Sequence, residues 1–393
     1  MQRGIIQTVT KRLKEPRMFI QVLCGPRQVG KTTLITQALR ETAIPHVYAS
    51  ADDAPDVSSI WLRQIWDKAR LGCKQAGGDY LLVVDEVQKI ANWSEVVKAE
   101  WDKDAFNNIA LKVVLLGSSS LLIQQGLTES LAGRYELIYI PHWSFGEMRD
   151  AFGFTLEEYV WFGGYPGAAA LVNDEWRWKE YVRQSLIEPS ITKDILMMQR
   201  VDKPALLGRL FNLGCSYSAQ ILSLNKIQGE LNERGNLATL SNYLKLLASA
   251  DLLCGLEKYA GNVIRQRASK PKFQVFNNAL LSAQNSMTFS TVRADGKLWG
   301  RMVESAVGTH LLNRRKTGWY DVFYWNENSK EVDYVIQRGT DVVAIEVKSG
   351  YDSSNAGMAV FDELFHPKAM FTVGTDGIPL EEFLQMEPGE LLV

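Results

Sequence analysis

The segment at residues 19–33, FIQVLCGPRQVGKTT, constrains the fold of this 393-residue chain more than any other. It joins an apolar strand pattern to a helical pattern through a loop that fits GxxxxGK[ST]. Gly25 and Gly30 allow backbone N–H groups to approach phosphates, and the following helix adds the positive end of its dipole. This order of strand, loop and helix predicts a P-loop that binds a nucleotide. The expected nucleotide contacts are Gly25, Pro26, Arg27, Gln28, Val29, Gly30, Lys31, Thr32 and Thr33.

Four side chains have the chemistry to bind and hydrolyse ATP. Lys31 is expected to reach the β and γ phosphates, and the Thr32 hydroxyl is expected to be a ligand of Mg²⁺. A second apolar run, at 80–86, ends in Asp85-Glu86, and such strand ends form the ligand-binding edge of a parallel sheet. We predict that Asp85 holds Mg²⁺ through water and contributes to the cofactor site, and that Glu86 polarises the attacking water. The alternative for such a pair is a helix cap.

A third apolar run, LKVVLLGSSS at 111–120, ends in polar residues that include Ser118 and Ser119. Either serine is a candidate to contact the γ-phosphate or the attacking water, and a helix N-cap is the alternative. Arg134 follows a glycine and precedes an alternating strand. It is a candidate arginine finger that stabilises transition-state charge in a neighbouring subunit, with a surface arginine as the alternative.

Taken in order, GPRQVGKTT, LLVVDEVQK, VVLLGSSS, LAGRYELIYIPHWSFGE and WFGGYPGA resemble the AAA+-like bacterial and archaeal ATPases that carry a DUF4143-type C-terminal region. The resemblance runs along nearly the whole chain. It implies an α/β fold with a P-loop ASCE/AAA+-type parallel sheet core and a restriction-endonuclease-like C-terminal domain. The expected parts are an ATPase domain at 1–150, a helical lid at 151–210, a winged-helix-like segment at 211–262 and a PD-(D/E)xK nuclease-like α/β domain at 263–393.

The middle of the chain has a helical pattern that Gly163-Gly164-Tyr165-Pro166 interrupts, as a turn between helices would. We expect the tryptophans of this region, Trp161, Trp176 and Trp178, to lie in the core.

Further along, the run at 237–253 places four apolar residues at helical spacing, and an apolar strand pattern follows. A helix, a turn, a second helix and a strand predict a winged helix, which could bind a DNA groove or a protein. The four apolar residues are Leu240, Tyr243, Leu244 and Leu247.

The stretch from Lys258 to Ala294 contains no acidic residue. Such a basic run predicts contact with a phosphate backbone, and a solvated charged rim is the alternative. Its basic residues are Lys258, Arg265, Arg267, Lys270, Lys272 and Arg293.

The C-terminal part combines an amphipathic helix at 298–312 with two strand patterns, EVDYVIQ and VVAIEVKSG. Glu304 shares a helix face with apolar residues and so points partly toward the body of the domain. The strands carry Asp333, Glu346 and Lys348 in the D…ExK arrangement of PD-(D/E)xK nucleases.

Asp333 and Glu346 have the ligand chemistry of a Mg²⁺ site, and Glu304 is a candidate for a further ligand, directly or through water. Lys348 could then orient the attacking water or stabilise charge on the scissile phosphate. An exposed ion pair on a strand is the alternative. Val332 stands where these nucleases usually have proline, and some domains of this fold hold DNA without cutting it, so cleavage stays open.

The bulk composition limits the classes of function. The formal net charge is −2 at pH 7, so any contact with nucleic acid has to come from a local basic patch. The four cysteines are scattered without a CxxC pair, which favours a reduced, cytoplasmic setting. Residues 1–25 are charged throughout and contain no long apolar run, so neither a signal peptide nor a membrane span is expected.

These features favour an ATP-driven machine that remodels, translocates or processes DNA. It is expected to form a homo-oligomer, a hexameric ring, with ATP and Mg²⁺ as cofactors. The alternative is a nucleotide-dependent switch that acts on a protein partner, with an inactive nuclease-like scaffold. A small-molecule kinase is disfavoured because the pair Asp85-Glu86 suits the activation of water.

Overall fold

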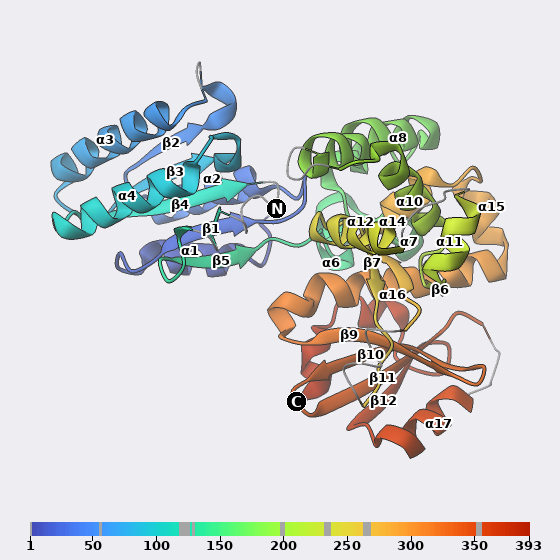
Figure 1. Cartoon of the computed structure of the whole chain (residues 1–393). Coiled ribbons are helices and arrows are strands. Elements are labelled where there is room, and N and C mark those ends of the chain that lie inside the picture. The colour runs from blue at the N-terminus through green and yellow to red at the C-terminus, as the bar shows by residue number, and fades with distance from the viewer. Residues whose placement is uncertain are drawn as a thin grey trace. The chain divides into compact units, whose positions relative to one another are not determined.

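The computed structural model contains two compact units, Met1–Pro141 and His142–Val393 (Figure 1). The residues that it describes are 2–54, 57–117, 126–127, 130–196, 201–231, 237–261, 269–350 and 356–393.

The N-terminal unit is built on a parallel sheet of five strands in the order β2-β3-β4-β1-β5. The strand that carries the P-loop is β1, and β4 lies between it and β3, which ends in the acidic pair. This arrangement confirms the predicted P-loop type of parallel sheet. The strands are β1 (Ile20–Cys24), β2 (His46–Ser50), β3 (Tyr80–Asp85), β4 (Leu111–Gly117) and β5 (Tyr135–Tyr139).

Helices cover both faces of this sheet, which explains why its central strands are almost continuously apolar. Ile20 and Val22 of β1 pack with the helices α3 and α4, whereas Leu23 packs with α1 and α2. The alternation follows from the two-residue period of a strand. The helices of the unit are α1 (Ile6–Lys14), α2 (Lys31–Thr42), α3 (Ser59–Ala76) and α4 (Trp93–Phe106), with short 3₁₀ turns η1 (Ala51–Asp53) and η2 (Val87–Lys89).

The C-terminal unit begins with short helical segments. The predicted turn after Phe162 is confirmed, because α7 ends there and Gly163 has a positive φ of 67°. A Cβ atom on Gly163 would lie 2.0 Å from the Asn277 side-chain oxygen, so the close packing at this turn requires glycine. The segments are α6 (Phe145–Phe152), α7 (Leu156–Phe162), η3 (Pro166–Leu171), α8 (Glu175–Tyr181), η4 (Val182–Ile187) and η5 (Ser190–Ile195).

The tryptophan prediction is right for two residues and wrong for the third. Trp161 and Trp178 are fully buried, but Trp176 is 71% exposed. Trp176 and Trp178 are two positions apart on α8, which separates their side chains by about 200° around the helix. Only one of them can therefore face the core.

A small antiparallel sheet in the order β6-β8-β7 follows, together with three helices. The four apolar residues at helical spacing are buried on one face of α12, as expected. The predicted strand is β7, and two further strands, β8 and β6, complete the sheet, whereas the winged-helix interpretation stays a prediction. The elements are α10 (Pro204–Ser216), β6 (Gln220–Ile221), α11 (Leu224–Glu230), α12 (Leu237–Ser249), β7 (Leu253–Leu256) and β8 (Lys272–Val275).

The last part of the unit is a mixed four-stranded sheet in the order β12-β11-β10-β9, with α16 on one face and α17 on the other. Strands β9, β10 and β11 are antiparallel, and β12 runs parallel to β11. The elements are α14 (Asn278–Gln284), α15 (Phe289–Ala294), α16 (Gly296–Gly318), β9 (Asp321–Glu327), β10 (Lys330–Arg338), β11 (Asp341–Lys348), α17 (Ala356–Phe365), β12 (Ala369–Gly374), α18 (Leu380–Phe383) and η6 (Pro388–Leu392).

A bulge interrupts the pairing of β10 with β9 between Val332 and Val335. Both valines pack on the α17 side of the sheet although they are three positions apart, and Tyr334 packs on the α16 side. Bulges re-aim side chains in this way. This irregularity falls at Asp333.

Among the helices in the described part of the chain, none is both long enough and apolar enough to span a bilayer.

Candidate functional site

The loop between β1 and α2 has the backbone that its sequence predicts. Gly30 is left-handed, with φ of 85°, and Gln28 also has a positive φ, of 62°. A Cβ atom on Gly25 would lie 2.1 Å from the Ile140 carbonyl oxygen. Gly25 is therefore required by the close approach of the chain just after β5, as well as by the motif.

The Lys31 side chain folds back onto this loop. Its Nζ atom donates to the carbonyl oxygens of Gly25 at 2.9 Å and Pro26 at 2.7 Å. Burial lowers the pKa of Lys31 to about 8, although the negative charges of Glu86 and Asp85 oppose this shift. The lysine is thus a buried cation at the centre of the loop.

The Asp85 carboxylate gathers three donors at the end of β3. One oxygen accepts from the Thr32 hydroxyl at 2.8 Å and from the Tyr48 hydroxyl at 2.6 Å. The other oxygen accepts from the backbone N–H of Glu86 at 2.8 Å. A threonine hydroxyl beside a carboxylate is oxygen chemistry that suits Mg²⁺, so the residues fit the predicted metal.

Glu86 has a left-handed backbone with φ of 53°, which is uncommon for a residue with a side chain. The Gln88 side-chain amide donates to the Glu86 carboxylate at 2.5 Å. The charge of this carboxylate acts on Lys31, which places it at the same end of the sheet as the P-loop. Backbone outliers of this kind are concentrated at functional sites.

The serines predicted to contact the γ-phosphate follow β4, the strand between the other two. β4 ends at Gly117, between β1 and β3. Ser118 and Ser119 lie outside the described residues.

Arg134 lies immediately before β5, at the end of the sheet where the parallel strands begin. The P-loop lies at the other end, where the strands finish. Its guanidinium donates to both carboxylate oxygens of Asp102, at 2.8 and 3.0 Å, and this contact lowers the pKa of Asp102. A five-residue strand spans about 17 Å, so Arg134 is too far to reach the P-loop of its own chain. Any role in the nucleotide chemistry would have to be exerted on another subunit.

Sequence reasoning missed two residues of the nucleotide site. The buried Arg3 donates to the carbonyl oxygens of Val29 and Pro141, both at 3.1 Å, and ties the P-loop to the end of the unit. No local pattern indicates such a contact. Tyr48 could have been found, because it lies on the strand that follows the P-loop helix and so leads to the same sheet edge.

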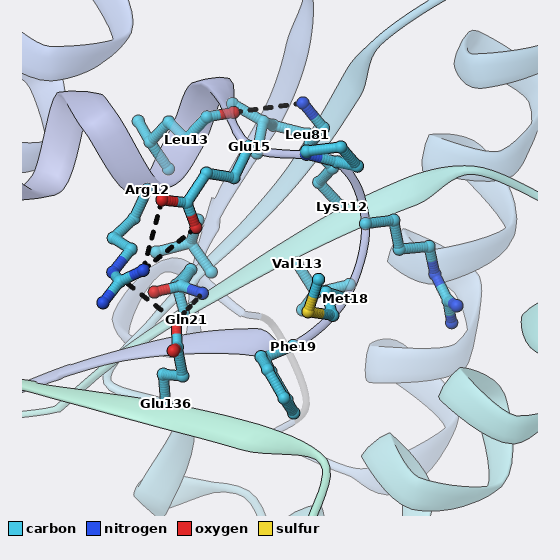
Figure 2. A pocket seen from close by; sticks show the side chains of 13 residues that line it. Arg12, Leu13, Glu15, Met18, Phe19, Gln21, Leu81, Lys112, Val113 and Glu136 are labelled. Atoms are coloured by element: carbon cyan, nitrogen blue, oxygen red, sulfur yellow. Dashed lines mark hydrogen bonds and ion pairs between the residues drawn. The ribbon is translucent and has the colours of Figure 1, made fainter.

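A small cavity beside Gln21 and Glu136 lies at the end of the sheet away from the P-loop. Its volume is about 20 Å³ (Figure 2). The Gln21 amide donates to the Glu136 carboxylate at 3.0 Å, and Arg12 pairs with Glu15 at 3.1 Å. This space holds roughly one water molecule, which excludes a nucleotide.

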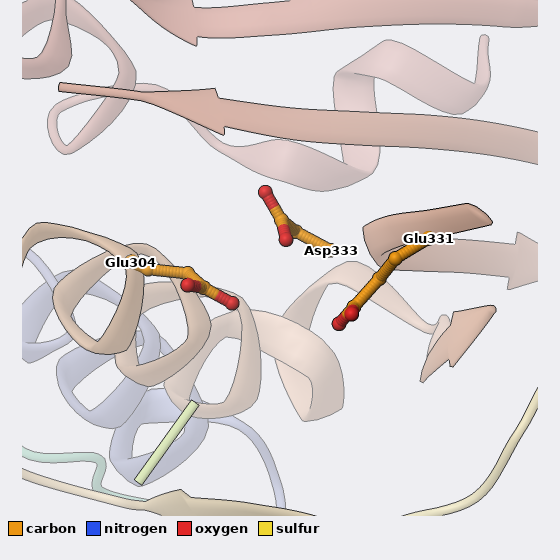
Figure 3. Close-up of side chains that lie close together, drawn as sticks. All are labelled: Glu304, Glu331 and Asp333. Atoms are coloured by element: carbon orange, nitrogen blue, oxygen red, sulfur yellow. The ribbon is translucent and has the colours of Figure 1, made fainter. Parts of the chain in front are cut away.

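In the C-terminal unit, Glu304 of α16 comes together with Glu331 and Asp333 of β10 (Figure 3). One carboxylate oxygen from each lies within 4.8 Å of the other two. Glu304 and Asp333 were predicted to act together, whereas Glu331 was not. Burial and the charge of Asp333 raise the pKa of Glu304 to about 8, against the opposing charge of Lys272.

Lys272 enters this carboxylate cluster from β8 and is fully buried. Its Nζ atom lies 2.6 Å from Glu304, 3.2 Å from Glu331 and 3.6 Å from the Asp333 carboxylate. It also donates to the Asp333 backbone carbonyl at 3.1 Å. The expectation that Lys272 contacts a phosphate backbone is therefore wrong, because the carboxylates and not solvent surround its charge.

Two other members of the basic run, Arg265 and Arg267, lie outside the described residues. Arg293 pairs with Glu157 at 3.3 Å and lies over the Trp299 ring at 4.8 Å.

The two remaining residues of the D…ExK pattern lie on β11. The register pairs Tyr334 with Ile345, which brings Asp333 alongside Glu346. The Val347 backbone N–H donates to the Asp333 carboxylate at 2.8 Å. Glu346 is not one of the three clustered acids. Burial and the charge of Asp333 raise its pKa to about 8, and its buried Oε2 atom has no hydrogen-bond partner among the described residues. Lys348 follows on the same strand and is partly buried.

An open pocket of about 610 Å³ lies over the carboxylate cluster. One wall comes from β6 and α11, and the other from α16 and β10. Three basic residues, Lys226, Lys270 and Arg301, line it together with the acids. The pocket therefore joins cationic walls to an acidic floor.

Three segments of the chain match family models. Residues 18–149 match an AAA domain, residues 153–291 match a domain of unknown function (DUF8612), and residues 299–386 match a domain of unknown function (DUF4143). The first match contains the P-loop and the acidic pair. The third contains the carboxylate cluster except for Lys272.

Two curated relatives align with long stretches of this chain. An uncharacterized protein of Haemophilus influenzae is 23% identical over 347 residues, which cover 84% of this chain and 82% of that protein. The uncharacterized protein Rv2008c of Mycobacterium tuberculosis is 25% identical over 268 residues. That alignment covers 67% of this chain and 56% of the mycobacterial protein.

Among solved structures, the Walker-type ATPase PABY2304 of Pyrococcus abyssi aligns with a TM-score of 0.45 and 13% identity, over 71% of this chain and 94% of that one. The Aeropyrum pernix ORC1 protein, solved in complex with DNA, aligns with a TM-score of 0.31 and 14% identity, over 73% of this chain and 92% of that one. Both scores are low, so the fold assignment rests on the strand order and the family matches. The chain contains an AAA domain of the P-loop ATPase type and a C-terminal domain of the DUF4143 type.

Proposed function

We propose that this chain binds and hydrolyses ATP with Mg²⁺ and that its ATPase cycle acts on DNA held by the C-terminal unit. One observation carries the first half of the proposal. Two pairs of residues that are distant in sequence, Lys31-Thr32 and Asp85-Glu86, come together at one end of a parallel sheet. This is where α/β sheets bind their ligands.

The chemistry follows from the contacts of these residues. The P-loop N–H groups and Lys31 would bind the phosphates. Thr32 and, through water, Asp85 would hold Mg²⁺, which neutralises charge on the transferring phosphoryl group. Glu86 would accept a hydrogen bond from the attacking water and orient it, and the hydrogen bond from Gln88 holds its carboxylate in position.

A Tyr48→Phe variant is expected to bind Mg²⁺ in the presence of ATP about 10–100-fold more weakly, since partners that orient a metal-binding carboxylate have effects of this size. The change removes the 2.6 Å hydrogen bond to Asp85 and nothing larger. The Mg²⁺ dependence of ATP turnover measures the effect. Tyr80→Phe, at the opposite end of β3, is the matched control and should leave that dependence unchanged.

ATP binding is expected to weaken as the pH rises through about 8. Lys31 must be protonated to bind phosphate, and burial lowers its pKa to about 8. Bound phosphates favour the protonated form, so ATP binding takes up a proton above this pH and Kd rises by up to about tenfold per pH unit. Titrations between pH 7 and 9.5 measure it. Lys31→Arg keeps its charge and should show no such rise, and a flat wild-type profile would contradict the argument.

We also propose that the ATPase forms a homo-oligomer, a hexameric ring, in which Arg134 acts on the neighbouring subunit. The position of Arg134 supports this proposal, because it lies at the end of the sheet away from the P-loop and cannot reach the P-loop of its own subunit. The division into an ATPase domain, a lid, a winged-helix-like segment and a nuclease-like domain at 1–150, 151–210, 211–262 and 263–393 is part of the same proposal.

The DNA half of the proposal is supported by the open pocket over the carboxylate cluster. Lys226, Lys270 and Arg301 line it, and cations in a groove are what a phosphate backbone requires. Lys272 offsets part of the acidic charge beneath them. Contacts of this kind position DNA without reading its sequence.

Fluorescence anisotropy with labelled DNA tests this half directly. Wild-type binding should weaken with salt, and the double variant Lys226→Ala/Arg301→Ala should lower the slope of log K against log salt by about 2 for duplex DNA. The double variant Lys68→Ala/Lys74→Ala removes the same charge from the exposed face of α3 and should keep the wild-type slope. Equal slopes for the two double variants would count against the pocket as the DNA site.

A further inference from the structure

Lys272 has the surroundings that a bound cation would have. Its three N–H donors are directed at Glu304, Glu331 and the Asp333 carbonyl, at 2.6, 3.2 and 3.1 Å. The Asp333 carboxylate adds a fourth oxygen at 3.6 Å. The ring of Tyr334 lies 4.9 Å away and closes the remaining side.

The anchoring of Lys272 keeps its charge in this place. β8 is the central strand of its sheet, and Lys272 pairs with Ile221 of β6 on one side and Leu256 of β7 on the other. The side chain is fully buried, so the carboxylates and not solvent surround its ammonium.

A divalent metal ion does not fit these residues while Lys272 is present. Such an ion needs oxygens at about 2.0–2.6 Å, and the oxygens of Glu304 and Glu331 that face the centre already bind the ammonium. The Asp333 carboxylate is also engaged, because one oxygen accepts from the Val347 N–H and the other faces Lys272. A metal ion here would have to displace the buried Lys272 ammonium from Glu304, Glu331 and Asp333.

We propose that Lys272 is the resident cation of the carboxylate cluster and takes the place that a Mg²⁺ ion would occupy. The cluster then links the three-stranded sheet, through β8, to α16 and β10, and it carries out no metal-dependent cleavage. This role replaces the metal-binding role that the sequence predicts for Glu304 and Asp333. It leaves the C-terminal unit as a part that holds nucleic acid without cutting it.

Mn²⁺ binding by the full, nucleotide-free chain tests this assignment, with electron paramagnetic resonance counting the bound ions. Wild type and Glu304→Gln should bind the same number of Mn²⁺ ions. Lys272→Met, which keeps an unbranched side chain as far as the ε position and removes the charged Nζ, should bind one more. The double variant Lys272→Met/Glu304→Gln should lose that additional ion.

A Mn²⁺ site in the wild type that Glu304→Gln abolishes would overturn the proposal. A folded Lys272→Met chain that gains no site would overturn it too. If Lys272→Met fails to fold even with Mn²⁺, the comparison of wild type with Glu304→Gln still decides. The measurement uses neither ATP nor DNA, so its result is independent of the proposed function.

Discussion

Replacing Glu86 by Gln is expected to lower the rate of ATP hydrolysis by about 10²–10⁴-fold, the range that a positioned acid or base contributes. The amide keeps the size of the side chain but cannot accept the proton of the attacking water. ATP affinity should stay close to that of the wild type, because Lys31, Thr32 and Asp85 keep their contacts. Phosphate release measures turnover, and the fluorescence of a labelled ATP analogue measures binding.

Gln88→Ala is the matched control for this variant. It keeps the Glu86 carboxylate and removes the 2.5 Å hydrogen bond that the Gln88 amide donates to it. Its loss of turnover should be smaller than that of Glu86→Gln. If Glu86→Gln kept turnover within a few-fold of the wild type, Glu86 would be no more than the cap that a carboxylate after a strand can also be.

Replacing Arg134 by Ala is expected to lower ATP turnover by about 10³–10⁵-fold, the range measured for arginine fingers. A finger that acts on a neighbour makes a further prediction. Arg134→Ala and Glu86→Gln chains are each inactive, but a mixture should regain turnover, since some interfaces then combine an intact Glu86 with an intact Arg134. Measuring turnover across mixing ratios provides the test.

Asp102→Asn separates this role from a structural one. It removes one partner of the bidentate pair but keeps the guanidinium. A finger predicts that this variant retains most of its turnover, whereas a structural ion pair predicts that it loses as much as Arg134→Ala. A mixture of subunits that exchange but regain no activity would contradict the action in trans.

The nucleotide site could be predicted well because its chemistry is carried by contiguous motifs. Gly25, Lys31 and Thr32 belong to one loop, and the acidic pair follows the strand that must end at the same edge. Tyr48 could have been found from its strand, but Arg3 could not be placed, because its role depends on contacts with residues distant in sequence. Arg3 reaches a carbonyl at position 141 that no local pattern relates to it.

The C-terminal cluster shows where strand and helix periodicity ceases to be sufficient. Val343 and Ile345 lie on one face of β11, as the two-residue period of a strand requires, and helical spacing correctly directed Glu304 toward the domain. Glu331 lies two positions before Asp333, a spacing that strand alternation places on one face, so its participation could have been derived, but the D…ExK pattern singles out Asp333 alone. Lys272 was beyond prediction, because its strand pairs outside the sheet whose acids it neutralises.

The steady-state ATPase rate with and without DNA tests the central claim most directly. Single-stranded, duplex, forked and four-way DNA are each added at low and at moderate salt, with Glu86→Gln as the blank. At least one form of DNA should stimulate wild-type turnover, and the stimulation should fall steeply as salt rises because it depends on phosphate contacts. Turnover and oligomeric state that no form of DNA changes would contradict the claim and favour a nucleotide-dependent switch that acts on a protein partner.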